Sequence, residues 1–245
     1  MEEQTMNYGL QMYSVRDITE KDLAGALKKV AEIGYKTVEF AGFFGNSAED
    51  VKAMLEENGL TVSGTHSGLD DLVKDFEGTV KYHKTIGNTN YILPSAPFQT
   101  KEELDDTIEK INKFQPMLAA EGITLGYHNH DLEFLPNKDG LIALEEMEKR
   151  TAINFQIDTF WAYFAGKDPI EVLTRLKDRI NVIHLKDGLA NGEGLALGEG
   201  TAPVFDVWKR ANELGMKIVV ESETLQPDGV SEATRCINYL RKIEE

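Results

Sequence analysis

The stretch Gln156-Ile157-Asp158-Thr159-Phe160-Trp161 closes an apolar, strand-like run that begins at Ile153, and the strand ends on a carboxylate. An Asp in this position can bind a metal or a substrate, but it can equally cap the loop or helix that follows. The neighbouring segments must therefore be interpreted together with it, because their order along the chain decides both the fold and the meaning of Asp158.

Seven other segments are strand-like, and segments with the 3.6-residue apolar periodicity of a helix alternate with the strands. Glycines at positions 34, 59, 87, 122 and 215 stand where an expected helix gives way to the next strand, the usual place of a left-handed residue. The expected strands span residues 6–13, 37–40, 60–66, 90–93, 123–128, 153–158, 180–185 and 217–221. The expected helices lie around 19–33, 47–58, between His66 and Gly87, and around 100–121, 139–149, 168–178, 204–214 and 230–243.

Eight strands that alternate with eight helices predict parallel strands in short β–α units rather than hairpins. Eight units in 245 residues give about 31 residues per unit, the length expected of a complete (β/α)₈ TIM barrel. An open doubly wound sheet would usually carry a glycine-rich phosphate turn after its first strand, and Tyr13-Ser14-Val15-Arg16 has no glycine. No linker divides the chain, so we predict one α/β barrel domain over residues 1–245.

Composition excludes several kinds of partner. A formal charge of −16 opposes binding to nucleic acid and to acidic membrane surfaces. Cys236 is the single cysteine, so an intrachain disulfide is impossible, and Met1–Thr5 does not resemble the start of a leader peptide. No apolar run approaches the roughly 20 residues needed to cross a bilayer. These features favour a cytoplasmic, soluble protein with a small-molecule substrate, and they leave a homo-oligomer open.

The active site of such a barrel lies at the carboxyl ends of its strands. The residues expected there are Gln11, Glu39, His66, Ser95, His128, Asp158, His184 and Glu221. The last four come from adjacent strands and supply two imidazoles and two carboxylates, the ligand types that bind a divalent first-row metal. We therefore predict one divalent metal ion held by His128, Asp158, His184 and Glu221.

Other polar and aromatic side chains belong to the same end of the expected barrel. His130 and Lys186 each follow a predicted ligand by two residues and so share its strand face. His130 is either part of the site or an anchor for its loop. Lys186 either binds an oxyanion or pairs with a carboxylate at the same end of the barrel. Residues predicted by position to contact a small-molecule substrate are Gln11, Glu39, His66 and Trp161. The glycine-rich segment 188–202 suits either a mobile cover over the site or a surface loop.

Several of these stretches resemble one known family. They are Gly9-Leu10-Gln11-Met12-Tyr13-Ser14-Val15-Arg16-Asp17, residues 127–134, residues 157–160, His184-Leu185-Lys186-Asp187, residues 198–200 and residues 219–221. The chain resembles the xylose isomerase-like TIM barrels, which include sugar phosphate isomerases and epimerases, ketose 3-epimerases, inosose dehydratases and, more distantly, endonuclease IV. The resemblance implies one ion of manganese, magnesium, cobalt or zinc, bound by Glu, Asp, His and Glu from strands five to eight.

The chain departs from that family pattern at two positions. Many relatives have Glu-Asn-His on the fifth strand, whereas this chain has His128-Asn129-His130, with Glu133 as a possible substitute ligand. Epimerases also carry a His three residues after the sixth-strand Asp, where this chain has Trp161. The ketose-epimerase mechanism needs two opposed carboxylates, and these two changes weaken that interpretation.

The resemblance implies proton abstraction next to a carbonyl that the metal polarises, with Glu221, His130 and Glu133 as candidate bases. Our first hypothesis is a metal-dependent sugar or sugar phosphate isomerase or epimerase. The alternatives are a dehydratase or lyase that acts on a keto-polyol or a 3-keto-glycoside, and a non-catalytic sugar-binding barrel. An endonuclease IV-like activity is disfavoured by the small number of histidines, by Trp161 and by the net charge.

Overall fold

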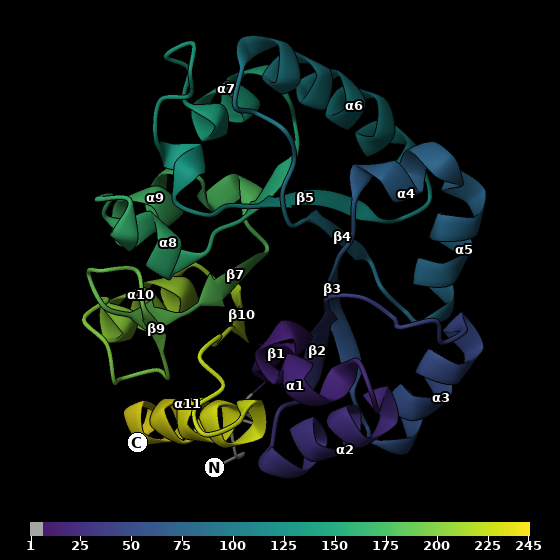
Figure 1. Cartoon of the computed structure of the whole chain (residues 1–245), viewed down its shortest axis with the longest axis vertical. Helices are drawn as coiled ribbons and strands as arrows, with labels where there is room; N and C mark the ends of the chain where they lie inside the picture. The colour runs from purple at the N-terminus through teal and green to yellow at the C-terminus, as the bar shows by residue number, and fades with distance from the viewer. Residues whose placement is uncertain (1–6) are drawn as a thin grey trace.

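A closed ring of parallel strands surrounded by helices forms the protein, as the computed structural model shows for the residues that it describes, 7–245 (Figure 1). The eight-stranded sheet has the order β6-β5-β4-β3-β2-β1-β10-β7. Its strands are β1 (Gly9–Gln11), β2 (Thr37–Phe40), β3 (Thr61–His66), β4 (Asn90–Leu93), β5 (Thr124–His128), β6 (Asn154–Gln156), β7 (Val182–Leu185) and β10 (Lys217–Val220).

The ring closes between β6 and β7 through isolated parallel bridges that join Phe155 to Ile180 and Asp158 to His184. The His184 amide donates to the Ile157 carbonyl over 2.9 Å. The predicted (β/α)₈ barrel is thereby confirmed, and its last closing contact lies directly beside two of the predicted metal ligands.

Eleven helices are present within the described residues, and they surround the strands (Figure 1). They are α1 (Arg16–Thr19), α2 (Leu23–Ile33), α3 (Ala48–Glu57), α4 (Leu69–Lys74), α5 (Phe76–Thr85), α6 (Lys101–Ala120), α7 (Ala143–Arg150), α8 (Thr159–Phe164), α9 (Pro169–Arg175), α10 (Val204–Glu213) and α11 (Gly229–Glu244). Short 3₁₀ turns cover Met12–Val15, Leu132–Phe134 and Lys177–Arg179.

Helix α2 illustrates how the sequence produces each unit. The Asp22 side chain accepts a hydrogen bond from the Gly25 amide and caps the amino terminus, while Gly34 ends the helix with a φ of 118°. Its apolar positions, which include Leu27 and Val30, are fully buried against the barrel. Burial of one such side chain contributes on the order of 2 kcal/mol.

The structure differs from the sequence-based prediction at several boundaries. The first strand is only Gly9–Gln11, because a 3₁₀ turn takes over at Met12; the expected start of this strand at Met6 lies outside the described residues. Helix α6, in contrast, covers almost the predicted range and continues through Pro116 without a break. Helix α8, which begins immediately after Asp158, was not predicted.

The glycine-rich segment after β7 is an anchored hairpin rather than a loose cover. Its strands β8 (Asp187–Gly188) and β9 (Gly194–Leu195) pair antiparallel. The buried Asp187 carboxylate accepts four backbone amides: Gly188 and Ala202 donate to Oδ1, and Gly198 and Gly200 donate to Oδ2, over 2.8–3.2 Å. One carboxylate thus fixes both ends of the segment beside Lys186.

Within residues 7–245, no helix has the length and apolar character that a membrane crossing requires. The residues Met1–Thr5, on which the expectation about a leader peptide rested, lie outside this range.

Candidate metal centre and active site

Four side chains from adjacent strands converge at the carboxyl end of the barrel. His128 ends β5, Asp158 follows β6, His184 lies in β7, and Glu221 follows β10. All four are at most 5% exposed. One donor atom from each lies within 4.8 Å of those of the other three. The predicted ligand set is therefore brought together by the fold.

The Asp158 carboxylate has two different environments. Its Oδ1 accepts the amides of Phe160 and Trp161, both over 2.9 Å, and so caps helix α8. Its Oδ2 is buried and has no hydrogen-bond partner within the described part of the chain. Asn129 fixes the backbone, because its side chain accepts from the Asp158 amide over 3.1 Å and donates to the Asp158 carbonyl over 3.3 Å. Burial raises the pKa of Asp158 to about 7, although Lys186 opposes the shift.

His128 occupies the position where many relatives have a glutamate. Its Nδ1 is buried and unpaired among residues 7–245. Burial, together with His184 and His66, holds the pKa of His128 well below its usual range. The ring is therefore neutral at physiological pH and offers a nitrogen lone pair, as a metal ligand must.

His184 lies between two carboxylates. Its Nδ1 is 3.3 Å from Glu221 Oε2, and its Nε2 is 2.6 Å from Glu39 Oε1. Burial alone would lower the pKa of His184, but the charges of Glu39 and Glu221 raise it to about 10. Burial would raise the pKa of Glu221, whereas Lys186 and His184 hold it well below its usual value.

The Glu39 carboxylate is hydrogen-bonded to neighbouring side chains at both of its oxygens. Its Oε1 accepts hydrogen bonds from Gln11 Nε2 over 2.7 Å and from His184 Nε2, and it lies 3.1 Å from His66 Nε2. Its Oε2 accepts a hydrogen bond from Gln156 Nε2 over 2.6 Å. Gln156 Oε1 in turn lies 2.8 Å from His66 Nε2. Burial would raise the pKa of Glu39, but His184 and His66 lower it, so this carboxylate stays ionised.

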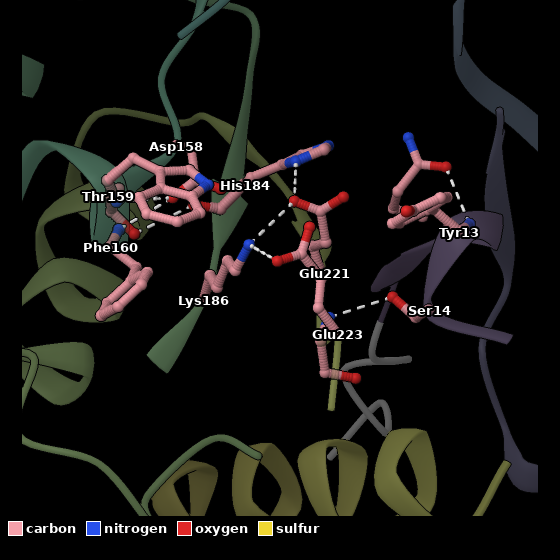
Figure 2. Close-up of polar contacts among 12 residues, drawn as sticks. Tyr13, Ser14, Asp158, Thr159, Phe160, His184, Lys186, Glu221 and Glu223 are labelled. Atoms are coloured by element: carbon pink, nitrogen blue, oxygen red, sulfur yellow. Dashed lines mark hydrogen bonds and ion pairs between the residues drawn. The ribbon is translucent and has the colours of Figure 1, made fainter. Parts of the chain in front are cut away.

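Lys186 brings a buried ammonium to the same site. Its Nζ is 2.7 Å from Glu223 Oε2 and 3.6 Å from Glu221 Oε2, and Figure 2 shows the side chain extended toward both carboxylates. Burial alone would lower the pKa of Lys186, but Glu221, Asp158 and Glu223 raise it. The ammonium also lies 4.7 Å from the centre of the Trp161 ring, and Trp161 Nε1 is buried without a partner in the described structure.

Glu133 and His130 have separate environments. Glu133 accepts the Tyr127 hydroxyl at Oε1 and the His130 amide at Oε2, both over 2.9 Å. Both of its oxygens are thus engaged in holding the loop after β5, and His128, not Glu133, joins the four-donor cluster. The His130 ring is partly exposed and lies 5.0 Å from the His128 ring and 5.9 Å from the Trp161 ring, centre to centre.

The four donors fit a divalent ion. They supply two nitrogens and two oxygens, all from positions at strand ends. Two of these residues carry an atom, His128 Nδ1 or Asp158 Oδ2, that is buried and has no partner among the residues that the structure describes. Native proteins seldom leave such atoms unpaired unless a ligand or an ion completes the site. Manganese, magnesium, cobalt and zinc all remain consistent with this mixed donor set.

The remaining sequence-predicted residues divide into two groups. Gln11 and Glu39 are fully buried, and their polar side-chain atoms are all bonded within the protein, an arrangement that suits a supporting role. His66 and Trp161 are partly exposed, so sugar contact stays a prediction for them.

Three polar residues of the site were not assigned a role from the sequence: Gln156, Asn129 and Glu223. Strand alternation could have found two of them, because Gln156 precedes Asp158 by two residues and Glu223 follows Glu221 by two. Asn129 has no periodic signal, since it lies in the turn between two histidines.

Comparison with known proteins matches residues 27–242 to the family described as xylose isomerase-like TIM barrel. The chain is 24% identical to an inosose dehydratase of Mesomycoplasma hyopneumoniae, over 89% of this chain and 87% of that protein. It is also 24% identical to an inosose dehydratase of Geobacillus kaustophilus, over 66% of this chain but only 60% of that protein.

Solved structures show the same architecture. The crystal structure of a sugar phosphate isomerase/epimerase from Parabacteroides distasonis superposes with a TM-score of 0.84 at 22% identity, and the match covers 98% of this chain and 94% of that chain. At this identity the likeness establishes the fold alone, while the chemistry must come from the side chains at the mouth.

Proposed function

The chain belongs to the xylose isomerase-like TIM barrel family, and from that premise we propose that it is a metal-dependent lyase that removes water from a cyclic keto-polyol. His128, Asp158, His184 and Glu221 would hold the divalent ion. When bound, such an ion polarises a carbonyl oxygen and stabilises the negative charge that develops on it. The similarity to inosose dehydratases supports a cyclic polyol ketone as the substrate class.

The acid and base of the reaction come from the loops next to this cluster. His130 takes the proton from the carbon beside the carbonyl, since its ring is partly exposed and stands between His128 and Trp161. The electrons of that C–H bond form the new C=C bond, and the bond to the hydroxyl on the next carbon breaks. Lys186 gives a proton to the leaving oxygen, which departs as water.

Glu223 supplies the route by which Lys186 regains its proton. The lysine side chain is fully buried, whereas Glu223, 2.7 Å away, is 30% exposed. A proton can therefore pass from solvent through this carboxylate to the neutral amine that Lys186 becomes when it protonates the leaving oxygen. Trp161, with its unpaired Nε1, and His66 provide hydrogen-bond partners for the ring hydroxyls.

The environment of Glu133 is the single observation that favours elimination over epimerisation. Epimerisation needs acid–base groups on both faces of the substrate carbon, and the family's epimerase pattern uses two carboxylates. Here the fifth-strand donor is the imidazole of His128, and Glu133 is occupied by Tyr127 and by the His130 amide. Elimination requires one base and one acid, which His130 and Lys186 can supply.

An isomerase or epimerase acting on a sugar or sugar phosphate is the second candidate. Lys186 supports it, because a buried ammonium at the mouth could also bind a phosphate group. In this reaction the proton is removed as before but returns to carbon, so the product keeps the mass of the substrate.

A single assay separates the two reactions. The purified protein, loaded with Mn²⁺, is incubated in D₂O with inososes, ketoses and 3-keto-glycosides, and the products are analysed by mass spectrometry and NMR. Loss of water from an inosose supports the lyase. Solvent deuterium at carbon without loss of water indicates the isomerase or epimerase, and no reaction with any substrate moves the assignment to a sugar-binding barrel.

The variant Asp158→Asn tests the site itself. The amide oxygen can still cap α8, but the charged ligand is lost, so kcat/KM should fall about a thousandfold or more, corresponding to several kcal/mol. Glu171→Gln, at an exposed position on α9, is the matched control and should retain full activity. Full activity of the Asp158 variant would disprove the assignment.

A further inference from the structure

Glu39 was predicted from the sequence to bind the sugar, but its surroundings point to another role. The side chain is 0% exposed, and each of its oxygens already has at least one strong partner. Oε1 receives the Nε2 groups of Gln11 and His184, while Oε2 receives Gln156. Because the side chain is fully buried behind these partners, a substrate could reach its oxygens only by displacing them.

The two nitrogens of His184 face different partners. Nε2 points to Glu39 over 2.6 Å, a distance typical of a strong charge-assisted hydrogen bond. Nδ1 points toward Glu221 over the longer distance of 3.3 Å. Since Glu221 is itself in the four-donor cluster, Nδ1 is the nitrogen on the side of the metal site.

We propose that Glu39 is a positioning residue that holds the Nε2–H of His184 and so directs Nδ1 toward the divalent ion. A ligand histidine whose other nitrogen donates to a carboxylate has a fixed tautomer, a fixed ring orientation and a more basic donor atom. The two glutamines hold Glu39 in turn, one from β1 and one from β6. This network therefore joins side chains of β1, β2, β6 and β7.

The proposal rests on the metal site of the proposed function, so it is tested by metal binding rather than by turnover. The affinities of the wild-type protein and of Glu39→Gln for Mn²⁺ and Zn²⁺ are measured by competition with a chromophoric chelator, together with the number of ions bound. Loss of the carboxylate should weaken binding about 10- to 100-fold with an unchanged stoichiometry of one ion.

Two further variants keep the test decisive. Gln156→Met removes the partner of Glu39 Oε2 together with the contact to His66 Nε2, but it leaves the Glu39 carboxylate on His184, so it should weaken the affinity by only about three- to fivefold. Glu232→Gln is the matched control: this carboxylate is also fully buried, but its hydrogen-bond donors are the Thr224 hydroxyl and the Leu225 amide, neither of which belongs to the four proposed ligands. Its loss should lower stability without changing metal affinity.

NMR of ¹⁵N-histidine-labelled, zinc-loaded protein gives a readout that a general loss of stability would not produce. In the wild type, one histidine should carry its proton on Nε2 with the metal on Nδ1, and this signal should be altered in Glu39→Gln.

The outcomes separate the two claims. A wild-type protein that binds no divalent ion contradicts the metal site and hence the proposed function. If the wild type binds one ion and Glu39→Gln binds it equally tightly, Glu39 has no positioning role. Binding of two ions would also overturn the proposal. The second ion would occupy the cluster of His66, His128 and His184, so that His184 Nε2 would carry metal instead of the proton that Glu39 is proposed to hold.

Discussion

Two arcs of the same barrel mouth use buried polar side chains in opposite ways. The first arc, made by residues of β1, β2 and β3, contains Glu39, whose oxygens are all hydrogen-bonded. The second arc, which extends from β5 to β10, contains His128 Nδ1 and Asp158 Oδ2, which are buried without partners in the described chain. Burial is equally deep in both, so Glu39 differs from His128 and Asp158 in the hydrogen bonding of its buried atoms rather than in depth.

Removal of the Lys186 ammonium should give the largest change in the free energy of unfolding. It tests whether the second arc is stable only when a cation balances its buried carboxylates. Lys186→Met leaves the Glu221 and Glu223 carboxylates without their cation, and we expect a loss of about 3–5 kcal/mol in the free energy of unfolding. Denaturant titration of the metal-free protein measures this loss. Added Mn²⁺ should restore part of it, because the ion would supply positive charge beside Glu221.

The control for this variant is Lys84→Met. Lys84 pairs with Glu121 over 2.9 Å on the surface, and the change should cost less than about 1 kcal/mol. Equal stability of the Lys186 variant and the wild type would show that the arc does not depend on this charge.

His83 extends the comparison to a histidine outside both arcs. Burial lowers its pKa to about 4, and its Nδ1 lies 3.3 Å from Thr65 Oγ1 and 3.1 Å from Asn88 Nδ2. His83 binds a proton near pH 6.5 in the unfolded chain but only near pH 4 in the folded chain. The contribution of the neutral His83 ring to the free energy of unfolding is therefore complete above pH 6.5. It is lost as the pH falls toward 4, by about 3 kcal/mol.

This contribution can be isolated by comparing the wild type with His83→Gln. The difference between their free energies of unfolding should shrink by about that amount between pH 7 and pH 4. A difference that is constant with pH would show that His83 titrates normally in the folded protein.

Gln11 should give the smallest effect, and it distinguishes support from substrate contact. Its amide donates to Glu39 and its oxygen accepts the Tyr13 amide over 3.2 Å. If it only supports the first arc, Gln11→Met should lower the free energy of unfolding by about 1–2 kcal/mol and leave KM within about twofold. A KM that rises tenfold with unchanged stability would instead establish the sugar contact predicted from the sequence.

The sequence predicted the barrel and the convergence of His128, Asp158, His184 and Glu221, because strand number and strand-end position follow from periodicity. It could not predict that Glu39 and Gln11 turn toward other side chains, since a strand-end position does not show which partner a side chain finds. The sequence likewise could not predict how the segment 188–202 is anchored, because the Asp187 carboxylate accepts hydrogen bonds from amides up to 15 residues away. Long-range hydrogen bonds of this kind have no periodic signature.

Asp158 has an evolutionary consequence, because one side chain both starts a helix and offers a metal ligand. Most substitutions at this position would remove the helix cap and the proposed ligand together. Selection against poor folding would therefore eliminate them before the loss of catalysis mattered. Asparagine is the exception, since its amide oxygen can still cap α8. A related barrel with Asn at this position would mark a lineage that has given up its metal and kept its architecture, as a step toward a binding protein.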